Sequence, residues 1–210
     1  MFRIICLVIG YAIGCFQTAY IVGRNFGKID IREHGSGGAG MTNVLRVMGA
    51  KAGLVVFVCD MLKSVIGYCV CSLIFGGAGS FLAGDGGLGY LPGLYGALGV
   101  ILGHNFPFYI NFKGGKGIAA MIGLILCFDF RVVLVIAVIA LPAIFITKYI
   151  SVASLLLSLL LPICMIIFKF PAEVVGLGFV LMALAYYQHR SNIGRLINGN
   201  ENKFSIKKKI

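Results

Sequence analysis

Seven apolar stretches separated by short polar segments constrain the fold of this chain more than any other feature. A helix needs about 20 mostly apolar residues to cross the hydrocarbon core of a bilayer, and most of the stretches approach that length. They cover residues 4–23, 52–75, 91–110, 117–128, 132–147, 151–168 and 172–189. The fourth is short enough to be a half-span, or one arm of a bent hairpin through residue 147. The pattern predicts an all-α membrane protein with about seven transmembrane helices.

Composition supports lipid as the solvent of this chain. Hydrophobic residues make up 60% of the 210 residues, charged residues only 12%, and the mean hydropathy is +1.00. Soluble domains carry roughly 25% charged residues, so a chain this apolar has too little polar surface to face water. Neither a Ser/Pro-rich linker nor an internal repeat interrupts the sequence, which predicts one integral-membrane domain over residues 1–210.

The basic residues predict the orientation in the membrane, because cytoplasmic loops carry an excess of Lys and Arg. With the N-terminus outside, the outer segments hold only Arg3, Arg131 and Lys169. The inner segments hold fourteen: Arg24, Lys28, Arg32, Arg46, Lys51, Lys113, Lys116, Lys148, Arg190, Arg195, Lys203, Lys207, Lys208 and Lys209. This asymmetry predicts an outside N-terminus, a cytoplasmic C-terminus and an odd number of spans.

A net charge of +11 indicates anionic partners. Because the basic residues stand at the ends of apolar spans, we expect membrane lipid headgroups and small phosphorylated substrates rather than nucleic acid. The seven cysteines lie in apolar runs, without Cys-x-x-Cys spacing and without a neighbouring His or carboxylate. We interpret them as small hydrophobic side chains, and we expect neither a metal nor a cofactor.

The first polar segment whose residues suit binding or catalysis is Gly35-Ser36-Gly37-Gly38-Ala39-Gly40-Met41-Thr42-Asn43, followed by Arg46. Glycines let the backbone approach a ligand closely and turn its N–H groups inward. Thr42 and Asn43 are expected to cap a helix through Arg46, and a helix N-terminus beside such a loop suits a phosphate. A plain flexible loop between two spans explains the glycines equally well.

The second segment runs from Gly103-His104-Asn105-Phe106-Pro107 to Phe112-Lys113-Gly114-Gly115-Lys116-Gly117. It again places cations and backbone donors at the start of a span. It is not a Walker A loop, because Ile118 follows Gly117. The alternative is that Lys113 and Lys116 only anchor the inner face and that His104 is structural.

The third segment is His189-Arg190-Ser191-Asn192-Ile193-Gly194-Arg195, at the end of the last span. Side chains three apart are neighbours on a helix, so His189, Asn192 and Arg195 are expected to share one face. An ordinary basic helix end is the alternative. In the predicted topology all three segments lie on the cytoplasmic side, which favours one shared site.

Two smaller features point to the same side. Asp60 and Lys63 are three residues apart inside the second span, where ionisable residues are costly and usually pair. We interpret them as a structural pair that braces the site. Ser151 and Ser154 begin another helix on the inner side, and their hydroxyls can either donate to a phosphate or simply cap that helix.

Together the three segments resemble the three motifs of the bacterial acyl-phosphate:glycerol-3-phosphate acyltransferases, an integral membrane family. Those motifs resemble Gly-Ser-Gly-Asn-x-Gly-Ala-Thr-Asn, then Gly-His-x-Phe-Pro…Phe-Lys-Gly-Gly-Lys-Gly, then His-Arg-x-Asn-Ile-x-Arg-Leu…Gly-x-Glu. Here they cover Gly35–Asn43, Gly103–Gly117 and His189–Glu201. Two residues depart from the first motif. Gly38 replaces the usual Asn and removes a side-chain amide, while Met41 replaces Ala and is expected to add bulk near the site.

The resemblance implies transfer of a fatty acyl group from acyl phosphate to the 1-hydroxyl of sn-glycerol 3-phosphate. The products are lysophosphatidic acid and phosphate, in the first step of phospholipid synthesis. It implies a multi-pass protein of the bacterial inner membrane, expected as a monomer, with its site facing the cytoplasm. An acyl phosphate is already activated, so the protein needs no nucleophile and has to position two anions together.

The roles that the resemblance implies fall into four groups. The residues expected to bind glycerol phosphate are Arg46, Lys116, Asn192 and Arg195. The residues expected to orient or deprotonate the attacking hydroxyl are Ser36 and His189. The residues expected to bind acyl phosphate are Gly37, Gly38, Gly40, Thr42, Asn43, Ser151 and Ser154. The supporting residues are His104, Lys113, Gly114, Gly115, Asp60 and Lys63.

Other classes fit less well. No His is followed by Asp in the His-x4-Asp pattern of another acyltransferase class, and the aspartates Asp30, Asp60, Asp85 and Asp129 are not paired as in metal-dependent phosphatidyltransferases. The alternative from a different class is a membrane transporter of organic phosphates. That would need inverted repeats or a polar path through the membrane, whereas the polar residues gather on one side.

Overall fold

The computed structural model describes residues 1–76 and 90–204, and all the regular structure in these residues is helical. The predicted all-α fold is therefore confirmed. In chain order the α-helices are α1 (Phe2–Gly14), α2 (Thr18–Val22), α3 (Met41–Met48), α4 (Ala50–Phe75), α5 (Leu91–Asn105), α6 (Ile118–Phe128), α7 (Phe130–Thr147), α8 (Ile150–Ile167), α9 (Ala172–Gln188) and α10 (Arg190–Ile197). A π-helical turn, Gly23–Gly27, continues α2. Short 3-10 turns cover Ile31–Glu33 and Phe108–Ile110.

Four of the described helical segments are long and apolar enough to cross a membrane. They are Phe2–Gly27, Ala50–Phe75, Phe130–Thr147 and Ile150–Ile167. Ile118–Phe128 and Ala172–Gln188 are apolar but shorter. The third expected span, 91–110, is a helix only to Asn105, because Pro107 lacks a backbone N–H and the chain then turns. Lys207, Lys208 and Lys209, which entered the orientation argument, lie outside the described residues.

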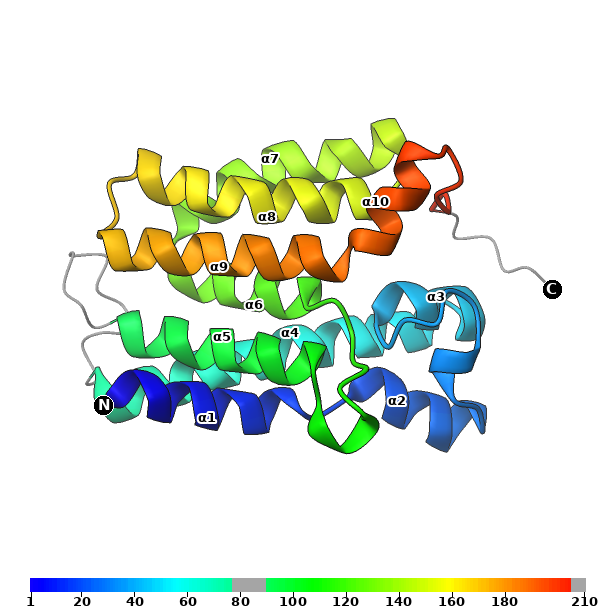
Figure 1. Cartoon of the computed structure of the whole chain (residues 1–210), viewed down its shortest axis with the longest axis horizontal. Helices are drawn as coiled ribbons and strands as arrows, with labels where there is room; N and C mark the ends of the chain where they lie inside the picture. The colour runs from blue at the N-terminus through cyan, green and yellow to red at the C-terminus, as the bar shows by residue number, and fades with distance from the viewer. Residues whose placement is uncertain (77–89, 205–210) are drawn as a thin grey trace. The chain divides into compact units, whose positions relative to one another are not determined.

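The chain divides into two compact units, Met1–Cys127 and Phe128–Ser205. In the first unit α1, α4 and α5 pack against one another (Figure 1). Glycines make the close contact between α1 and α5: a Cβ on Gly10 would collide with the backbone of Gly96, and one on Gly99 with the backbone of Leu7. Small residues at such seams let membrane helices approach closely, where packing is the main attraction between them.

The first expected span, 4–23, is broken rather than continuous. α1 ends at Gly14, and α2 begins only at Thr18. The buried amide of Gln17 fills the break, since its Nε2 donates to the carbonyls of Gly103 and His104 at 3.3 and 3.1 Å. Interrupted backbone inside a membrane is tolerated where protein surrounds it. The break therefore ties the first span to the end of α5 and opens carbonyl groups toward the unit's interior.

In the second unit α7, α8 and α9 pack in chain order, and α10 follows α9 (Figure 1). Asp129 starts α7: its carboxylate accepts hydrogen bonds from the backbone N–H groups of Arg131 and Val132 at 2.8 and 3.4 Å. The rings of Phe128 and Phe170 lie 4.7 Å apart. A capped start and aromatic packing thus hold one end of this helical layer.

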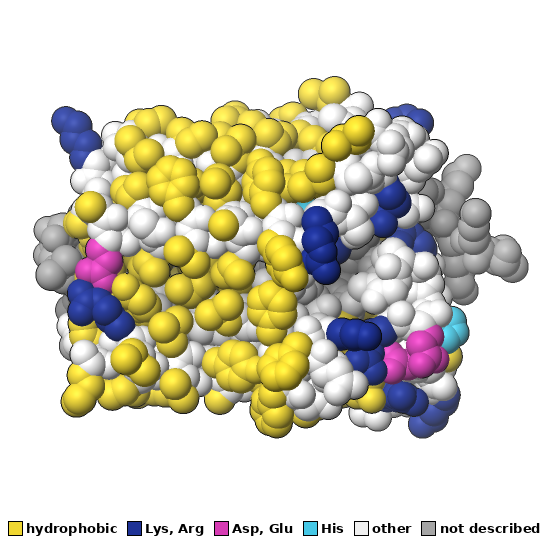
Figure 2. Space-filling view, in the orientation of Figure 1, with side chains coloured by type: hydrophobic (Ala, Val, Ile, Leu, Met, Phe, Trp, Pro, Cys, Tyr) yellow, Lys and Arg dark blue, Asp and Glu magenta, His cyan; other side chains and the backbone are white. Residues whose placement is uncertain are grey.

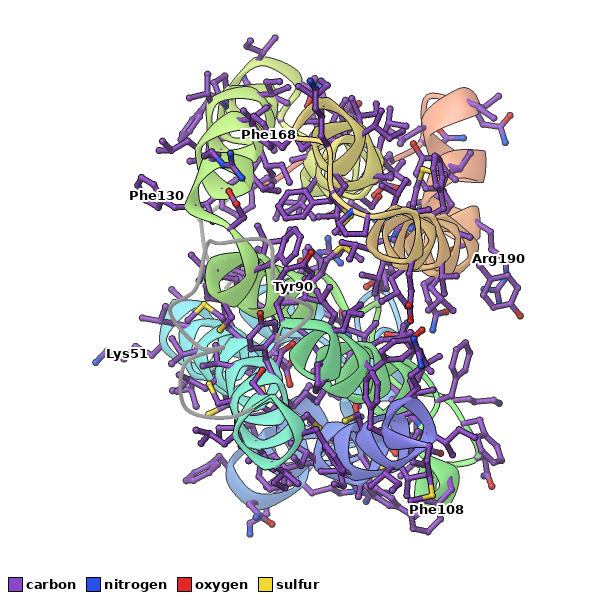
Figure 3. All side chains as sticks on the ribbon, turned by 90° about the vertical axis from the view of Figure 1, so that its left-hand side faces the viewer. Lys51, Tyr90, Phe108, Phe130, Phe168 and Arg190 are labelled. Carbon is purple, nitrogen blue, oxygen red and sulfur yellow. The ribbon has the colours of Figure 1, made fainter. Side chains whose placement is uncertain are left out.

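Large apolar side chains cover much of the outer face of both units. Exposed examples are Val8, Leu73, Val138, Ile146 and Ile167. Figure 2 shows yellow side chains over the helices of each unit and dark blue and magenta side chains at the end of the first unit where α2 and α3 lie. Phe130, 71% exposed, points away from the ribbon in Figure 3. Such apolar surface faces lipid in a membrane protein, whereas on a soluble protein it would be an aggregation hazard.

Candidate functional site

The first glycine-rich segment is held by the side chain of Asn43. Asn43 is 3% exposed, and its Nδ2 donates to the carbonyls of Ile31 and His34, both at 2.9 Å. Its Oδ1 accepts from the backbone N–H and the hydroxyl of Ser36, at 2.8 and 3.2 Å. Gly35 adopts φ +62°, a left-handed conformation that costs glycine little. The amide of Asn43 therefore organises the loop instead of projecting toward a ligand.

The start of α3 differs from the prediction that Thr42 and Asn43 cap this helix. Gly40 occupies the capping position, and no side chain caps it. Thr42 and Asn43 lie in the first turn, with the Thr42 hydroxyl partly exposed. The first backbone N–H groups of a helix have no partner within that helix, and its dipole favours an anion there. An uncapped helix start next to Gly37 and Gly38 has the geometry of a phosphate site.

The expectation that Met41 adds bulk near the site stays a prediction, and its sulfur lies 3.9 Å from the Thr42 hydroxyl. Met41 packs against the buried cluster of Ala19, Val22, Ile31, Val44 and Val56, on the interior side of α3. Its side chain fills that core, because the unbranched thioether adapts to irregular gaps. At Gly38 a Cβ would lie 3.9 Å from the Ser36 hydroxyl, so the loop has room for the side chain that this chain lacks.

Asp30 fixes the approach to the first segment. Its buried carboxylate accepts from the backbone N–H, Nε and Nη2 of Arg32 at 3.0, 3.0 and 2.7 Å, and Arg24 adds a contact at 3.4 Å. These bonds and the positive charge of Arg32 lower the pKa of Asp30 to about 2, so the group is ionised at neutral pH. Arg32 Nη1 also donates to the carbonyl of Ile110 at 3.3 Å, which links this segment to the second one.

The second segment folds back on the end of α5. The backbone N–H groups of Gly114 and Gly115 donate to the carbonyls of Asn105 and His104 at 3.1 and 3.0 Å. Asn111 and Phe112 both take left-handed φ values of +57°, which turn the chain back toward the end of α5. Lys113 is exposed and Lys116 is partly exposed, directly before α6 begins. The loop thus presents both lysines at a helix start, as the spacing predicted.

The first and second segments meet at Gly115. A Cβ there would collide with Nε2 of His104 and would lie 2.7 Å from the carbonyl oxygen of Ala39. Gly115, His104 and Ala39 are all buried. A side chain of any size is therefore excluded at residue 115, and the absence of one lets the two loops touch. Within the first unit, the two glycine-rich loops therefore lie against each other at Gly115.

The ion pair expected between Asp60 and Lys63 is present, with Nζ 2.9 Å from Oδ1. Both side chains are buried at no more than 5% exposure. Lys63 Nζ also lies 2.8 Å from His104 Nδ1 and within reach of the carbonyls of Gly14 and Phe16 at the break in the first span. This pair therefore connects α4 to both the broken span and the second segment.

The third segment lies in the second unit, where His189 is the N-cap of the helix that contains Asn192 and Arg195. α9 ends at Gln188, and α10 begins after His189. The His189 ring is buried, and its Nδ1 donates to the carbonyl of Ala185 at 2.8 Å. In a neutral ring this bond leaves the lone pair on Nε2, as a proton acceptor requires. Arg190 is exposed and stacks on Tyr187, 4.4 Å from the ring centre (Figure 3).

The carboxylate of Glu201 accepts hydrogen bonds from three polar side chains of the second unit. Oε1 of Glu201 accepts from Asn192 Nδ2 at 2.8 Å and from Ser151 Oγ at 3.3 Å, and Oε2 accepts from Arg195 Nε at 2.8 Å. Ser154 instead donates to the carbonyl of Ile150, within its own helix, at 2.9 Å. Glu201 was not predicted as a site residue, although the Gly-x-Glu at the end of the third motif was the signal for it.

Replacing Glu201 by Gln should loosen the segment after α10. The Gln side chain keeps one oxygen but loses the charge that Arg195 pairs with, at a cost of about 1–3 kcal/mol. We expect faster proteolytic cleavage within residues 198–204 of the folded protein. Lys203→Gln changes an exposed side chain of the same segment and should cleave like the wild type. Equal cleavage rates for both variants would contradict the gathering role of Glu201.

Among residues 1–76 and 90–204, no three His, Cys, Asp or Glu side chains form a group that could hold a metal ion. The polar groups of the candidate site are cations, turned backbone amides and hydroxyls. In the first unit they come from the loops around Ser36 and Lys116, and in the second from the residues around Glu201.

Comparison with known proteins identifies the family. The sequence model described as glycerol-3-phosphate acyltransferase matches residues 4–199. A glycerol-3-phosphate acyltransferase of Thermoanaerobacter pseudethanolicus is 38% identical over 210 residues, which is 100% of both chains. One from Clostridioides difficile is 37% identical over 205 residues, covering 98% of this chain and 97% of the relative.

The chain belongs to the glycerol-3-phosphate acyltransferase family. The crystal structure of PlsY, an integral membrane glycerol 3-phosphate acyltransferase in its glycerol 3-phosphate form, superposes with a TM-score of 0.84 at 28% identity. It covers 97% of this chain and 96% of that one. A second PlsY structure, the lysophosphatidic acid form, has a TM-score of 0.80 at 29% identity. The integral membrane fold of the family is thus the fold of this chain.

Each of the three family-like motifs lies in one of the two groups of polar residues: the first two motifs meet at Gly115, and the third surrounds Glu201. The residues that reasoning from the sequence missed, Asp30 and Glu201, are both carboxylates that hold arginines in place. Asp30 has no signature in the sequence, because its role depends on which arginine the fold brings to it, whereas Glu201 had the Gly-x-Glu of the third motif.

Proposed function

We propose that this protein transfers a fatty acyl group from acyl phosphate to the 1-hydroxyl of sn-glycerol 3-phosphate. The products would be lysophosphatidic acid and inorganic phosphate. The observation that carries the proposal is the contact at Gly115, where a lysine-flanked loop meets the turned backbone of a second glycine-rich loop. Two such loops at helix starts suit two phosphate groups. The PlsY structures, one a glycerol 3-phosphate form and one a lysophosphatidic acid form, support the acceptor and the product.

The mechanism relies on placement rather than on an enzyme nucleophile. The acceptor hydroxyl attacks the acyl carbonyl, the C–O bond to phosphate breaks, and the phosphate departs as a good leaving group. Holding both substrates in one orientation can supply several kcal/mol of the barrier. Arg46, Lys116, Asn192 and Arg195 would screen the repulsion between the two anions. The backbone N–H groups at the start of α3, with Thr42 and the glycines before it, would hold the acyl phosphate.

Ser36 and His189 would orient the attacking hydroxyl or accept its proton. The geometry supports a proton acceptor at Nε2 of His189, because Nδ1 already donates to Ala185. Asn43 has a different proposed role from the one first assigned: it positions Ser36 through Oδ1. Ser151 would act through Glu201, while Ser154 is bonded within α8.

The proposal also includes a topology and a location. We propose seven spans, with the N-terminus outside and the C-terminus cytoplasmic, in a bacterial inner membrane. α6 has eleven residues, about 16 Å of helix, so it is the shortest of the proposed spans. The whole chain would form one catalytic domain and act as a monomer, with its site on the cytoplasmic face. The excess of basic residues on the inner segments supports this orientation.

The function is tested with purified protein in detergent or in vesicles without a gradient. Acyl phosphate, acyl-CoA and acyl carrier protein are offered side by side with glycerol 3-phosphate, and lysophosphatidic acid is measured. We expect product from acyl phosphate alone. Transport of glycerol phosphate into sealed vesicles without product formation would favour the transporter instead.

Replacing Arg46 or Lys116 by Ala should raise the KM for glycerol 3-phosphate. A charge-assisted hydrogen bond contributes about 1.5–3 kcal/mol, which corresponds to roughly a 10- to 100-fold loss of affinity. Lys51→Ala serves as the control, because this side chain projects away from α4 (Figure 3). Steady-state kinetics with varied glycerol 3-phosphate give the comparison. Unchanged kinetics in both Arg46→Ala and Lys116→Ala would defeat the assignment.

A further inference from the structure

A buried cluster behind the second segment determines which ring nitrogen of His104 carries the proton. Lys63 Nζ lies 2.8 Å from His104 Nδ1, 2.8 Å from the carbonyl oxygen of Phe16, 2.9 Å from Asp60 Oδ1 and 3.3 Å from the carbonyl oxygen of Gly14. Three of these partners are oxygens that can only accept. The Lys63 side chain is 5% exposed, so water contributes little to the cluster.

Charge balance decides the protonation of this cluster. The carboxylate of Asp60 is 2% exposed and receives a further hydrogen bond from the Thr18 hydroxyl at 3.2 Å. A buried carboxylate is tolerated when a cation compensates it, and Lys63 is the cation in contact. A Lys ammonium has three N–H donors and no acceptor. His104 Nδ1 lies closer to Lys63 Nζ, at 2.8 Å, than to Asp60 Oδ1, at 3.6 Å. On this geometry Nδ1 accepts from Lys63, and the single proton of the neutral ring is on Nε2.

The opposite edge of the ring points to the contact between the two glycine-rich loops. Nε2 of His104 lies against the position that a Cβ on Gly115 would take, and that position is 2.7 Å from the carbonyl oxygen of Ala39. The backbone of His104 is held as well, since its carbonyl accepts from Gly115 N at 3.0 Å and from Gln17 Nε2 at 3.1 Å. An N–H at Nε2 is thus a donor with a fixed direction at the junction of the first and second segments.

We propose that Lys63, balanced by Asp60, is a positioning residue for the transfer reaction: it holds His104 as the Nε2–H tautomer, which sets the spacing of the two loops. This inference rests on the proposed function, because the loops matter to catalysis only if they hold the phosphate groups. Lys63 touches no substrate in this role. It acts through His104 and Gly115, and the cluster accounts for a buried ion pair that packing alone does not require.

The tautomer is measured directly by nitrogen NMR of 15N-histidine-labelled full-length protein in micelles. The chain has three histidines, His34, His104 and His189, so His34→Gln and His189→Gln assign the His104 signals. We expect a neutral His104 ring with the proton on Nε2. In the Asp60→Asn/Lys63→Gln double variant, which removes both charges together, we expect a tautomer mixture. A wild-type ring protonated on Nδ1, or an unchanged tautomer in the folded double variant, would overturn the inference.

Kinetics provide the second readout. In the folded double variant, kcat should fall on the order of 10- to 100-fold, because the two loops no longer hold the reacting groups in place. The KM for glycerol 3-phosphate should change little. His104→Gln places an amide N–H near the Nε2 position and should keep more activity than His104→Asn, whose amide reaches only the Nδ1 position. Equal activities of these two variants, or a greater activity of His104→Asn, would overturn the inference even if the double variant fails to fold.

The two proposals fail in distinguishable ways. A wild-type protein that forms no lysophosphatidic acid from acyl phosphate would refute the proposed function. An active wild-type protein whose double variant folds and keeps the wild-type kcat would refute the positioning role of Lys63 and leave the proposed function intact.

Discussion

Replacing Gly115 by Ala is expected to reduce acyl transfer by at least about 100-fold, because a displacement of about 1 Å can cost that much. The added methyl group would collide with the His104 ring and lie 2.7 Å from the carbonyl oxygen of Ala39. Neither neighbour can move freely: the ring is bonded to buried Lys63, and the Ala39 oxygen is backbone. The two loops must therefore separate. Initial rates with acyl phosphate and glycerol 3-phosphate measure the effect.

Gly176→Ala is the matched control for this change. Gly176 lies in α9, and a Cβ there would meet nothing within 4 Å. Because Ala is a better helix former than Gly, this variant should keep full activity and gain up to about 1 kcal/mol of stability. A folded Gly115→Ala protein with wild-type kcat/KM would show that the two loops do not need this contact.

Replacing Asn43 by Ala should both destabilise the protein and suppress its activity. The change leaves the N–H of Ser36 and the carbonyls of Ile31 and His34 without the partner they have now. Buried polar groups left without partners cost about 1–3 kcal/mol each, so we expect a loss of about 2–4 kcal/mol, since Ser36 regains water. Activity should fall on the order of 100-fold, because Ser36 loses its position.

A thiol-reactive dye can follow unfolding of this variant, since Cys6, Cys71 and Cys164 are buried in the folded protein. Asn25→Ala makes the same chemical change at an exposed position of the first unit and should leave both the transition temperature and the rate unchanged. If Asn43→Ala lost activity without any shift in the transition, the side chain would act on the substrate rather than on the loop.

Local hydrophobic pattern was sufficient to locate the long membrane helices. The long spans at 52–75, 132–147 and 151–168 were correctly located, with α4, α7 and α8 ending within a few residues of them. Their apolar length alone determines a membrane helix. The break in the first span was missed, because Cys15, Phe16 and Gln17 carry no local signal for an interruption. The break is stabilised by partners far along the chain, the carbonyls of Gly103 and His104.

The sequence predicted the residue types of the candidate site but not the hydrogen bonds and packing contacts within it. Glycine spacing predicted turned backbone at Gly35 and Gly37, and both have positive φ. Spacing could not show that Asn43 bonds to Ser36 or that Met41 packs inward. Spacing also did not show the turn at His189, which separates α9 from α10 and makes His189 the N-cap of the helix that contains Asn192. In each case a hydrogen bond or a core contact outweighed local propensity.

By itself the sequence determined that this chain is a helical membrane protein, where its long spans lie and where its three family-like motifs lie, because apolar length, glycine and charge act locally. Only the tertiary structure decided that Gly115 lets two loops touch, that Lys63 lies between Asp60 and the ring of His104, and that Glu201 accepts hydrogen bonds from Ser151, Asn192 and Arg195. These contacts join residues far apart in the chain. Their existence depends on how buried groups satisfy charge and hydrogen bonding together, and no single segment contains that information.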